Sequence, residues 1–136
     1  MSYILKPGKN SAWRKRVLNN LVADVILYGK IETSLSLVRN KSKNDLTKLL
    51  AKLVGWAKKA NQEPEKKQHF YRLALRHLVN KKKIEIKQGG KKIRVLSELF
   101  DNLGKKYQNR PGGYSRISKL GSRKGDNNLR AIFSLV

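Results

Sequence analysis

The chain of 136 residues has no cysteine, one methionine and two histidines, and these shortages exclude several kinds of chemistry. Without cysteine there are no disulfides, iron–sulfur clusters, thiolate zinc sites or thiol nucleophiles. No apolar run approaches the roughly 20 residues that a membrane-spanning helix needs. Residues 1–6 have no long apolar segment of the kind found in secretory signals, so we expect a cytoplasmic location.

Acidic residues are also scarce: nine Asp and Glu stand against 32 Lys and Arg, which gives a formal charge of +23. A chain with this excess repels itself when it folds alone, so it predicts a polyanionic partner. Nucleic acid is the first expectation and an anionic membrane surface the second. The cations are spread along the chain, and residues 104–136 hold eight of them against one acid, Asp126. The surface of a basic protein without such a partner would carry positively and negatively charged side chains interspersed.

The residues that catalysis or metal binding would need are poorly arranged. His69 and His77 are separated by two helical turns, so we expect one packed and one exposed histidine rather than a pair of metal ligands. Glu98 and Asp101 are expected on the outer face of an amphipathic helix, without a partner that would tune them for acid–base work. Phosphate-binding motifs of the GxxxxGK[ST] and GxGxxG types are absent. We therefore expect no enzyme, no cofactor and no metal.

Apolar periodicity and turn residues predict an α+β fold, with about four helices packed on a small, mostly antiparallel or mixed three-stranded sheet. The predicted helices cover residues 11–28, 34 or 36 to 60, 64–80 and 93–103, and the predicted strands cover 30–34, 114–120 and 129–136. Ser11 is expected to cap the first helix, and Gly104 to end the fourth. Residues 84–86 fit a loop, a helix extension or a small hairpin. Residues 1–10 are expected to form an extended basic arm ahead of a single domain, residues 11–136.

A rigid turn lies next to permanent cations near the C-terminus. Pro111 fixes its own φ, while Gly112 and Gly113 tolerate positive φ and leave the backbone bare. The Pro-Gly pair predicts a type II turn. Arg110 and Arg116 flank this turn with guanidinium groups that only donate hydrogen bonds and suit phosphate. The segment is therefore predicted to meet phosphates.

Three segments concentrate the residue types that contact phosphates in nucleic-acid-binding proteins. They are the N-terminal arm with the start of the first helix, the turn at residues 110–116, and a basic hairpin loop at residues 122–128. The predicted RNA contacts are Lys6, Lys9, Asn10, Ser11, Arg14, Lys15, Arg16, Arg110, Gly112, Gly113, Tyr114, Arg116, Lys119, Arg123 and Lys124. Glu32 is expected to orient a neighbouring cation.

Four aromatic residues fit either stacking on unpaired bases or packing within the protein, and we favour packing. They are Tyr3, Trp13, Tyr107 and Tyr114.

Two blocks of residues are together similar to one known family. The C-terminal block is Glu98-Leu99-Phe100, Leu103-Gly104, Tyr107, residues 110–117, Lys119, Gly121, Arg123 and residues 125–127, and the earlier block is Trp13-Arg14 with residues 30–34. They resemble bacterial large-subunit ribosomal protein seventeen, in order and over most of the chain. The resemblance implies an α+β protein that binds large-subunit rRNA near the exit of the nascent-peptide tunnel, beside other ribosomal proteins. It implies no small-molecule substrate and no membrane partner.

Two other classes of protein stay open from the residues alone. A helix-turn-helix DNA-binding regulator needs a recognition helix and a dimer surface, whereas the cations here are spread over many elements. A protein that lies on a membrane needs a basic amphipathic helix with an exposed apolar face. The apolar stripes in this chain are numerous enough to pack against one another.

Overall fold

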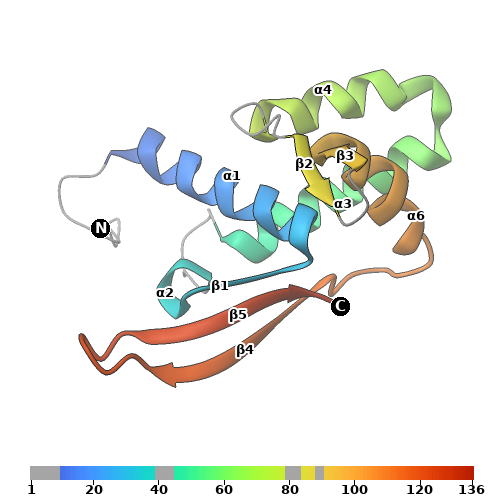
Figure 1. The fold of residues 1–136 in the computed structure, drawn as a ribbon. Helices are drawn as coiled ribbons and strands as arrows, with labels where there is room; N and C mark the ends of the chain where they lie inside the picture. Colours follow the sequence, from blue (N-terminus) through green and yellow to red (C-terminus); the bar gives the residue numbers. More distant parts are fainter. Residues whose placement is uncertain (1–9, 39–44, 79–83, 88–90) are drawn as a thin grey trace.

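The computed structural model describes residues 10–38, 45–78, 84–87 and 91–136. The elements in chain order are α1 (Ser11–Tyr28), β1 (Lys30–Ser34), α2 (Leu35–Val38), α3 (Leu46–Gln62), the 3₁₀ turn η1 (Pro64–Lys66), α4 (Lys67–Leu78), β2 (Ile84–Lys87), β3 (Lys91–Arg94), α5 (Val95–Ser97), the π-helical segment η3 (Glu98–Leu103), α6 (Gly104–Lys106), β4 (Ser115–Ser122) and β5 (Leu129–Leu135). A layer of helices lies against one side of a three-stranded antiparallel sheet (Figure 1). The predicted α+β class is confirmed. The expected arm, with Tyr3, Lys6 and Lys9, falls outside the described residues except for Asn10.

Local signals set both ends of α1. The side chain of Asn10 accepts a hydrogen bond from the backbone N–H of Trp13 at 2.8 Å, so Asn10 is the N-cap and Ser11, the predicted cap, is the first helical residue. Gly29 ends the helix in the left-handed region at φ 80°, where a residue without Cβ is favoured. Leu18, Val22 and Ile26 recur every four residues and are buried.

The prediction of one helix from residue 34 or 36 to residue 60 is wrong. A single turn, α2, follows β1, and a separate helix, α3, begins at Leu46. Asp45 caps α3 by accepting a hydrogen bond from the backbone N–H of Thr47 at 3.3 Å. A cap residue followed directly by a buried leucine starts a new helix, and the apolar pattern alone did not reveal this start. The third predicted helix is confirmed as η1 and α4, with Pro64 in its first turn.

The segment left open at residues 84–86 belongs to a two-stranded hairpin of β2 and β3. The following helical stretch, α5 with η3 and α6, does not end at Gly104 as predicted. Gly104 is helical, with φ −59° and ψ −41°. A Cβ at this position would lie 2.7 Å from Asn61 Nδ2 and 3.2 Å from the Cβ of Ala57, so the glycine allows close packing against α3.

Replacing Gly104 by Ala is expected to lower the free energy of unfolding by about 1–2 kcal/mol, because the overpacking outweighs the gain in helix propensity. The matched control is Gly55→Ala in the middle of α3, where nothing lies within 4 Å of an added Cβ. That substitution is expected to raise the free energy of unfolding by about 0.5–1 kcal/mol. Urea unfolding of both variants measures the two effects, and a gain at both positions would contradict the packing role of Gly104.

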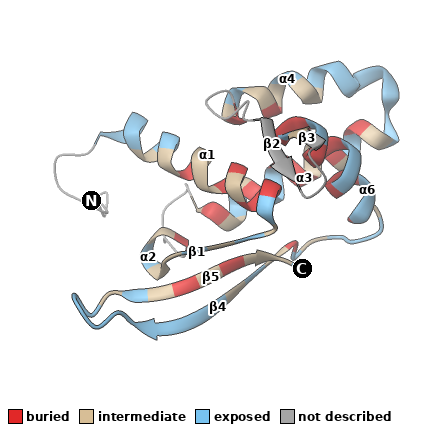
Figure 2. Ribbon diagram, viewed as in Figure 1, coloured by how far each residue is buried: buried red, intermediate tan, exposed pale blue. Residues whose placement is uncertain are grey.

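The sheet has the strand order β1-β5-β4, so the last strand in the sequence, β5, lies in the middle of the sheet. Phe133 on β5 lies opposite Ile31 on one side and Ile117 on the other. Phe133 and Ala131 are fully buried against the helices, whereas most of β4 is exposed (Figure 2). The hydrophobic core therefore lies between the helical layer and one face of the sheet.

Candidate nucleic-acid interface

The face of the sheet that points away from the helices is built from the residues that alternate with the buried ones. Directly opposite residues of antiparallel strands share a face, so the neighbours of the Phe133 row point outward. We call these residues the open sheet face. They form three rows across the strands: Lys30, Ser134 and Arg116; Glu32, Ile132 and Ser118; and Ser34, Arg130 and Gly121.

The open sheet face is basic and carries many hydroxyl groups. Its one carboxylate, Glu32, pairs with Arg130, with 3.1 Å between Oε1 and Nη2. The expectation that Glu32 orients a neighbouring cation is therefore confirmed. Arg116 and Lys30 stand in the same row on the two edge strands and are both exposed. This face presents cations and small polar groups suited to phosphate.

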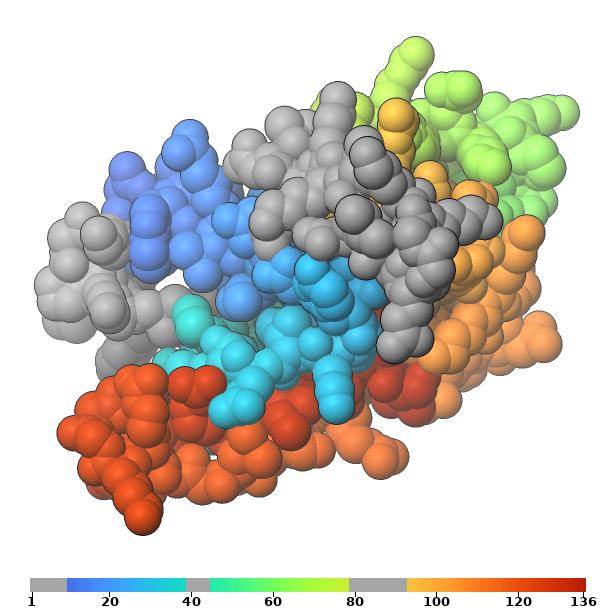
Figure 3. Space-filling model, viewed as in Figure 1, coloured from blue at the N-terminus to red at the C-terminus, as the bar shows by residue number. Residues whose placement is uncertain are grey.

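The loop between β4 and β5 extends the basic surface beyond the body of the protein (Figure 3). Arg123 donates through both Nε and Nη2 to the carboxylate of Asp126, at 3.0 Å for Nε. Asp126 also accepts a hydrogen bond from the backbone N–H of Asn128 at 3.1 Å. The bond from Arg123 is the largest cause that lowers the pKa of Asp126 to about 2. The carboxylate thus stays charged and orients Arg123, beside the exposed Lys124.

The turn at residues 110–114 is tied to helix α3. Lys58 Nζ donates to the carbonyl of Arg110 at 2.6 Å and to the hydroxyl of Tyr114 at 3.2 Å. Arg110 Nε donates to the carbonyl of Gly112 at 3.1 Å. Positive φ falls at Gly113, at 64°, and not at Gly112, so the predicted type II turn centred on Pro111 and Gly112 is wrong. Its contacts with α3 and with the end of β5 shape this turn instead.

Two buried tyrosines pack next to the same turn. Tyr107 and Tyr114 are only 3% and 7% exposed, and their ring centroids are 5.2 Å apart. The hydroxyl of Tyr107 donates to the carbonyl of Val136 at 2.7 Å. The preferred interpretation, packing rather than stacking, is confirmed for both. Tyr114 therefore supports the turn and is not a platform for an RNA base, whereas Trp13 is 38% exposed at the start of α1.

The structure brings together only part of the predicted site. The start of α1, with exposed Lys15 and Arg16, and the tip of the β4–β5 hairpin lie at one end of the molecule (Figure 1). The turn at residues 110–114 lies at the other end, and strand β4 runs between this turn and the hairpin tip. Asn10 uses its side chain as a helix cap. The predicted contacts are thus spread along the molecule and do not form a single patch.

Sequence reasoning missed three cations of this surface. Lys30 and Arg130 lie on the open sheet face, and their alternation with buried strand residues was the signal that could have revealed them. Lys58 positions the turn from a distant helix, and nothing local marks it among the other lysines of α3.

The histidines and acids that the structure describes form no catalytic arrangement. His77 is half-buried and packs on Trp56, with 5.8 Å between ring centroids, whereas His69 is exposed, as predicted. Glu98 is only 8% exposed and accepts a hydrogen bond from Asn102 Nδ2 at 2.8 Å, which corrects its expected place on an outer face. Within residues 10–38, 45–78, 84–87 and 91–136, no cluster of three His, Asp or Glu could hold a metal ion. In the same ranges no helix is both long and apolar enough to cross a bilayer.

The fold and this surface define a small α+β protein with an extended basic surface. Residues 17–136 match the family described as Ribosomal protein L17. The large ribosomal subunit protein bL17 of Mycoplasma pneumoniae is 38% identical over 136 residues, which is 100% of this chain and 96% of that protein. That of Mesoplasma florum is 39% identical over 100% of both chains, and that of Mycoplasmopsis pulmonis is 40% identical over 94% of this chain and 92% of its own.

The chain belongs to the ribosomal protein L17 family. It is thus a structural component of the ribosome and not an enzyme, in agreement with the expectation from its residues.

Proposed function

We propose that this chain binds and stabilises folded large-subunit rRNA within the large ribosomal subunit, and so supports translation. The observation that carries the proposal is the continuous basic surface of the open sheet face and the β4–β5 loop. Its two carboxylates, Glu32 and Asp126, each pair with an arginine and do not form an acidic patch. Cations held in this way neutralise phosphates and release condensed counterions.

The proposed phosphate contacts come from four parts of the surface. They are Asn10, Ser11, Arg14, Lys15 and Arg16 at the start of α1; Lys30, Arg116 and Arg130 on the open sheet face; Lys119, Arg123 and Lys124 along the hairpin; and Arg110, Gly112 and Gly113 in the turn. Lys6 and Lys9 are proposed as further contacts that precede α1. Because these groups contact backbone rather than base edges, they position the protein on an RNA shape and do not read a sequence.

The location that we propose is the neighbourhood of the nascent-peptide exit, beside other large-subunit proteins. The support is the residue-level resemblance of the C-terminal block, which includes the turn and the hairpin loop. Crosslinks from this chain within assembled large subunits test the location, because each crosslinked RNA segment or protein is a neighbour. Crosslinks only to RNA and proteins remote from the tunnel exit would contradict it.

The salt dependence of RNA binding tests the phosphate interface. If about eight of the twelve proposed cations contact phosphates at the same time, the expected slope is near −6 to −7 in a plot of log affinity against log salt concentration. The measurement is a titration of the full chain with a folded large-subunit rRNA fragment at several salt concentrations. A slope shallower than about −2 would be incompatible with an extensive phosphate interface.

A further inference from the structure

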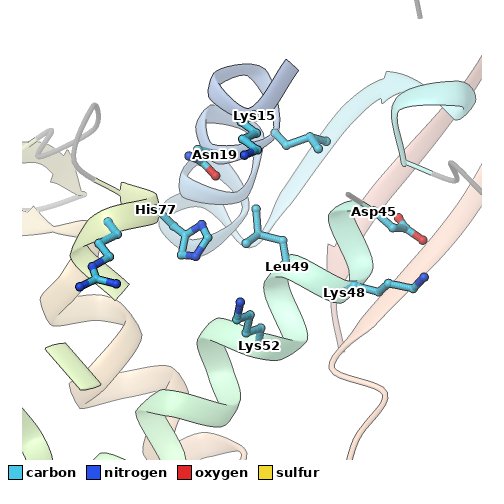
Figure 4. Close-up of a pocket in the computed structure, with 9 residues that line it drawn as sticks. Lys15, Asn19, Asp45, Lys48, Leu49, Lys52 and His77 are labelled. Atoms are coloured by element: carbon cyan, nitrogen blue, oxygen red, sulfur yellow. The ribbon is translucent and has the colours of Figure 1, made fainter. Parts of the chain in front are cut away.

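A groove between three helices lies apart from the open sheet face and includes Lys15 at the start of α1. Helices α1, α3 and α4 enclose a cavity of about 320 Å³ (Figure 4). Lys15 and Asn19 from α1, Lys52 from α3 and His77 from α4 lie around it, and Lys48 lines its rim on α3 and extends away from the other side chains. Leu18 and Leu49 are the apolar part of its lining. We call this cavity the helical groove.

Positive charge dominates the helical groove. Among the described residues of its lining, four side chains are cations, Lys15, Lys48, Lys52 and Arg76, and one is an acid, Asp45. Within the described residues none of the four cations forms an ion pair. Asp45 already accepts the hydrogen bond that caps α3. Cations from three helices repel one another when no carboxylate balances them. This arrangement favours the binding of an anion.

His77 adds a group that can respond to such an anion. Burial is the main cause that lowers its pKa, and the neighbouring charges of Lys52 and Lys15 lower it further. The imidazole is therefore neutral at pH 7 and stacks on Trp56. A phosphate in the groove would stabilise the protonated form and raise the pKa of His77.

We propose that the helical groove is a second phosphodiester site, which takes an RNA segment separate from the one on the open sheet face. This inference rests on the proposed function. The described residues that line the groove come from the helical layer and from Asp45 at the start of α3, whereas the open sheet face points away from that layer. A single RNA strand cannot lie straight across both the groove and the open sheet face. The protein would therefore bind two RNA segments and hold them at a fixed separation.

The shape of the groove favours an RNA backbone over an acidic peptide. An extended peptide gains affinity by adding to a sheet edge, and a helical peptide by filling an apolar groove. Helices form the described walls of this groove, and the apolar side chains among its described lining residues are two leucines. Lysine ammonium groups on flexible stems suit the point charge of a phosphate.

Directed cleavage from a single attached probe tests the proposal in assembled large subunits. The chain has no cysteine, so Lys48→Cys at the groove and Ser118→Cys on the open sheet face each give one unique site for an iron-EDTA probe. We expect both probes to cut rRNA, in two different segments, with the unlabelled wild-type chain as background. Cleavage by the Ser118→Cys probe alone, a groove probe that cuts only a neighbouring protein, or one RNA segment cut by both would overturn the proposal. If neither probe cuts RNA, the proposed function fails as well.

Charge reversal provides a second test with a matched control. Lys52→Glu combined with Arg76→Glu is expected to weaken binding to large-subunit rRNA about tenfold and to make the salt slope shallower by about 2. Lys59→Glu with Arg72→Glu changes the same helices and the same net charge outside the groove. Equal losses in the two double variants would overturn the groove site.

The His77 pKa gives a readout that does not depend on these substitutions. In an NMR titration of the full wild-type chain, inorganic phosphate is expected to raise the pKa of His77. An unchanged His77 pKa up to millimolar phosphate would count against the site.

Discussion

Reversing the charges of Arg116, Arg123 and Lys124 together to Glu is expected to weaken binding to large-subunit rRNA by about 100-fold or more near 0.1 M salt. Each substitution removes a proposed phosphate contact and adds a repulsive charge, and each is expected to contribute roughly 1 kcal/mol or more. Arg116 lies on the open sheet face, and the other two lie on the protruding loop. All three are exposed, so the fold should tolerate the change. A filter-binding titration at fixed salt measures the loss.

The matched control reverses three exposed cations on α3 and α4. Lys59, Lys67 and Arg72 changed to Glu give the same net charge but lie outside both the basic surface and the helical groove. Long-range attraction alone should then cause a loss of about tenfold or less. If both triple variants lost affinity equally, binding would depend on net charge and not on the proposed surface.

Phe133→Ala is expected to lower the free energy of unfolding by about 3–5 kcal/mol. Phe133 is fully buried on the central strand, between Ile31 and Ile117, where the sheet meets the helical layer. Truncation would leave a cavity at this junction, against a total stability of about 5–15 kcal/mol for a domain of ordinary size. Urea unfolding followed by circular dichroism measures the loss.

Leu129→Ala on the same strand is the control for this truncation. Leu129 is 54% exposed, so its loss should change the free energy of unfolding by less than about 0.5 kcal/mol. A loss below about 1 kcal/mol for Phe133→Ala would mean that the sheet and the helices are not joined through this ring.

Local signals predicted some elements closely. Gly29 ends α1, and the β-branched residues after it form β1, because both effects act within a few residues of the chain. The C-terminal strands followed from alternation around a polar loop. Prediction failed where the same local sequence pattern is compatible with two different structures. Asp45 starts a new helix inside an apolar pattern that reads as one, and Gly104 packs against α3 although a glycine there resembles a helix end.

Some residues of the candidate site could also be predicted from the sequence, and others could not. Arg110, Arg116 and Arg123 were predicted from residue type and neighbours, because permanent cations in or beside glycine-containing turns can be recognised in the sequence. The role of Lys58 was not predictable, since its contact with the carbonyl of Arg110 joins residues 52 positions apart. The helical groove was equally hidden, because its cations come from three helices and only their packing brings them together.

The sequence by itself determined that this protein is basic, lacks the residues for thiol or paired-metal chemistry, and carries the C-terminal block of its family. These properties depend on composition and on short runs of residues, which need no folding to be read. The tertiary structure decided which cations share a face, which tyrosines are buried and where a groove opens. Those outcomes depend on strand register and helix packing. Residues far apart in the chain bury apolar surface against one another, and these contacts fix their relative positions.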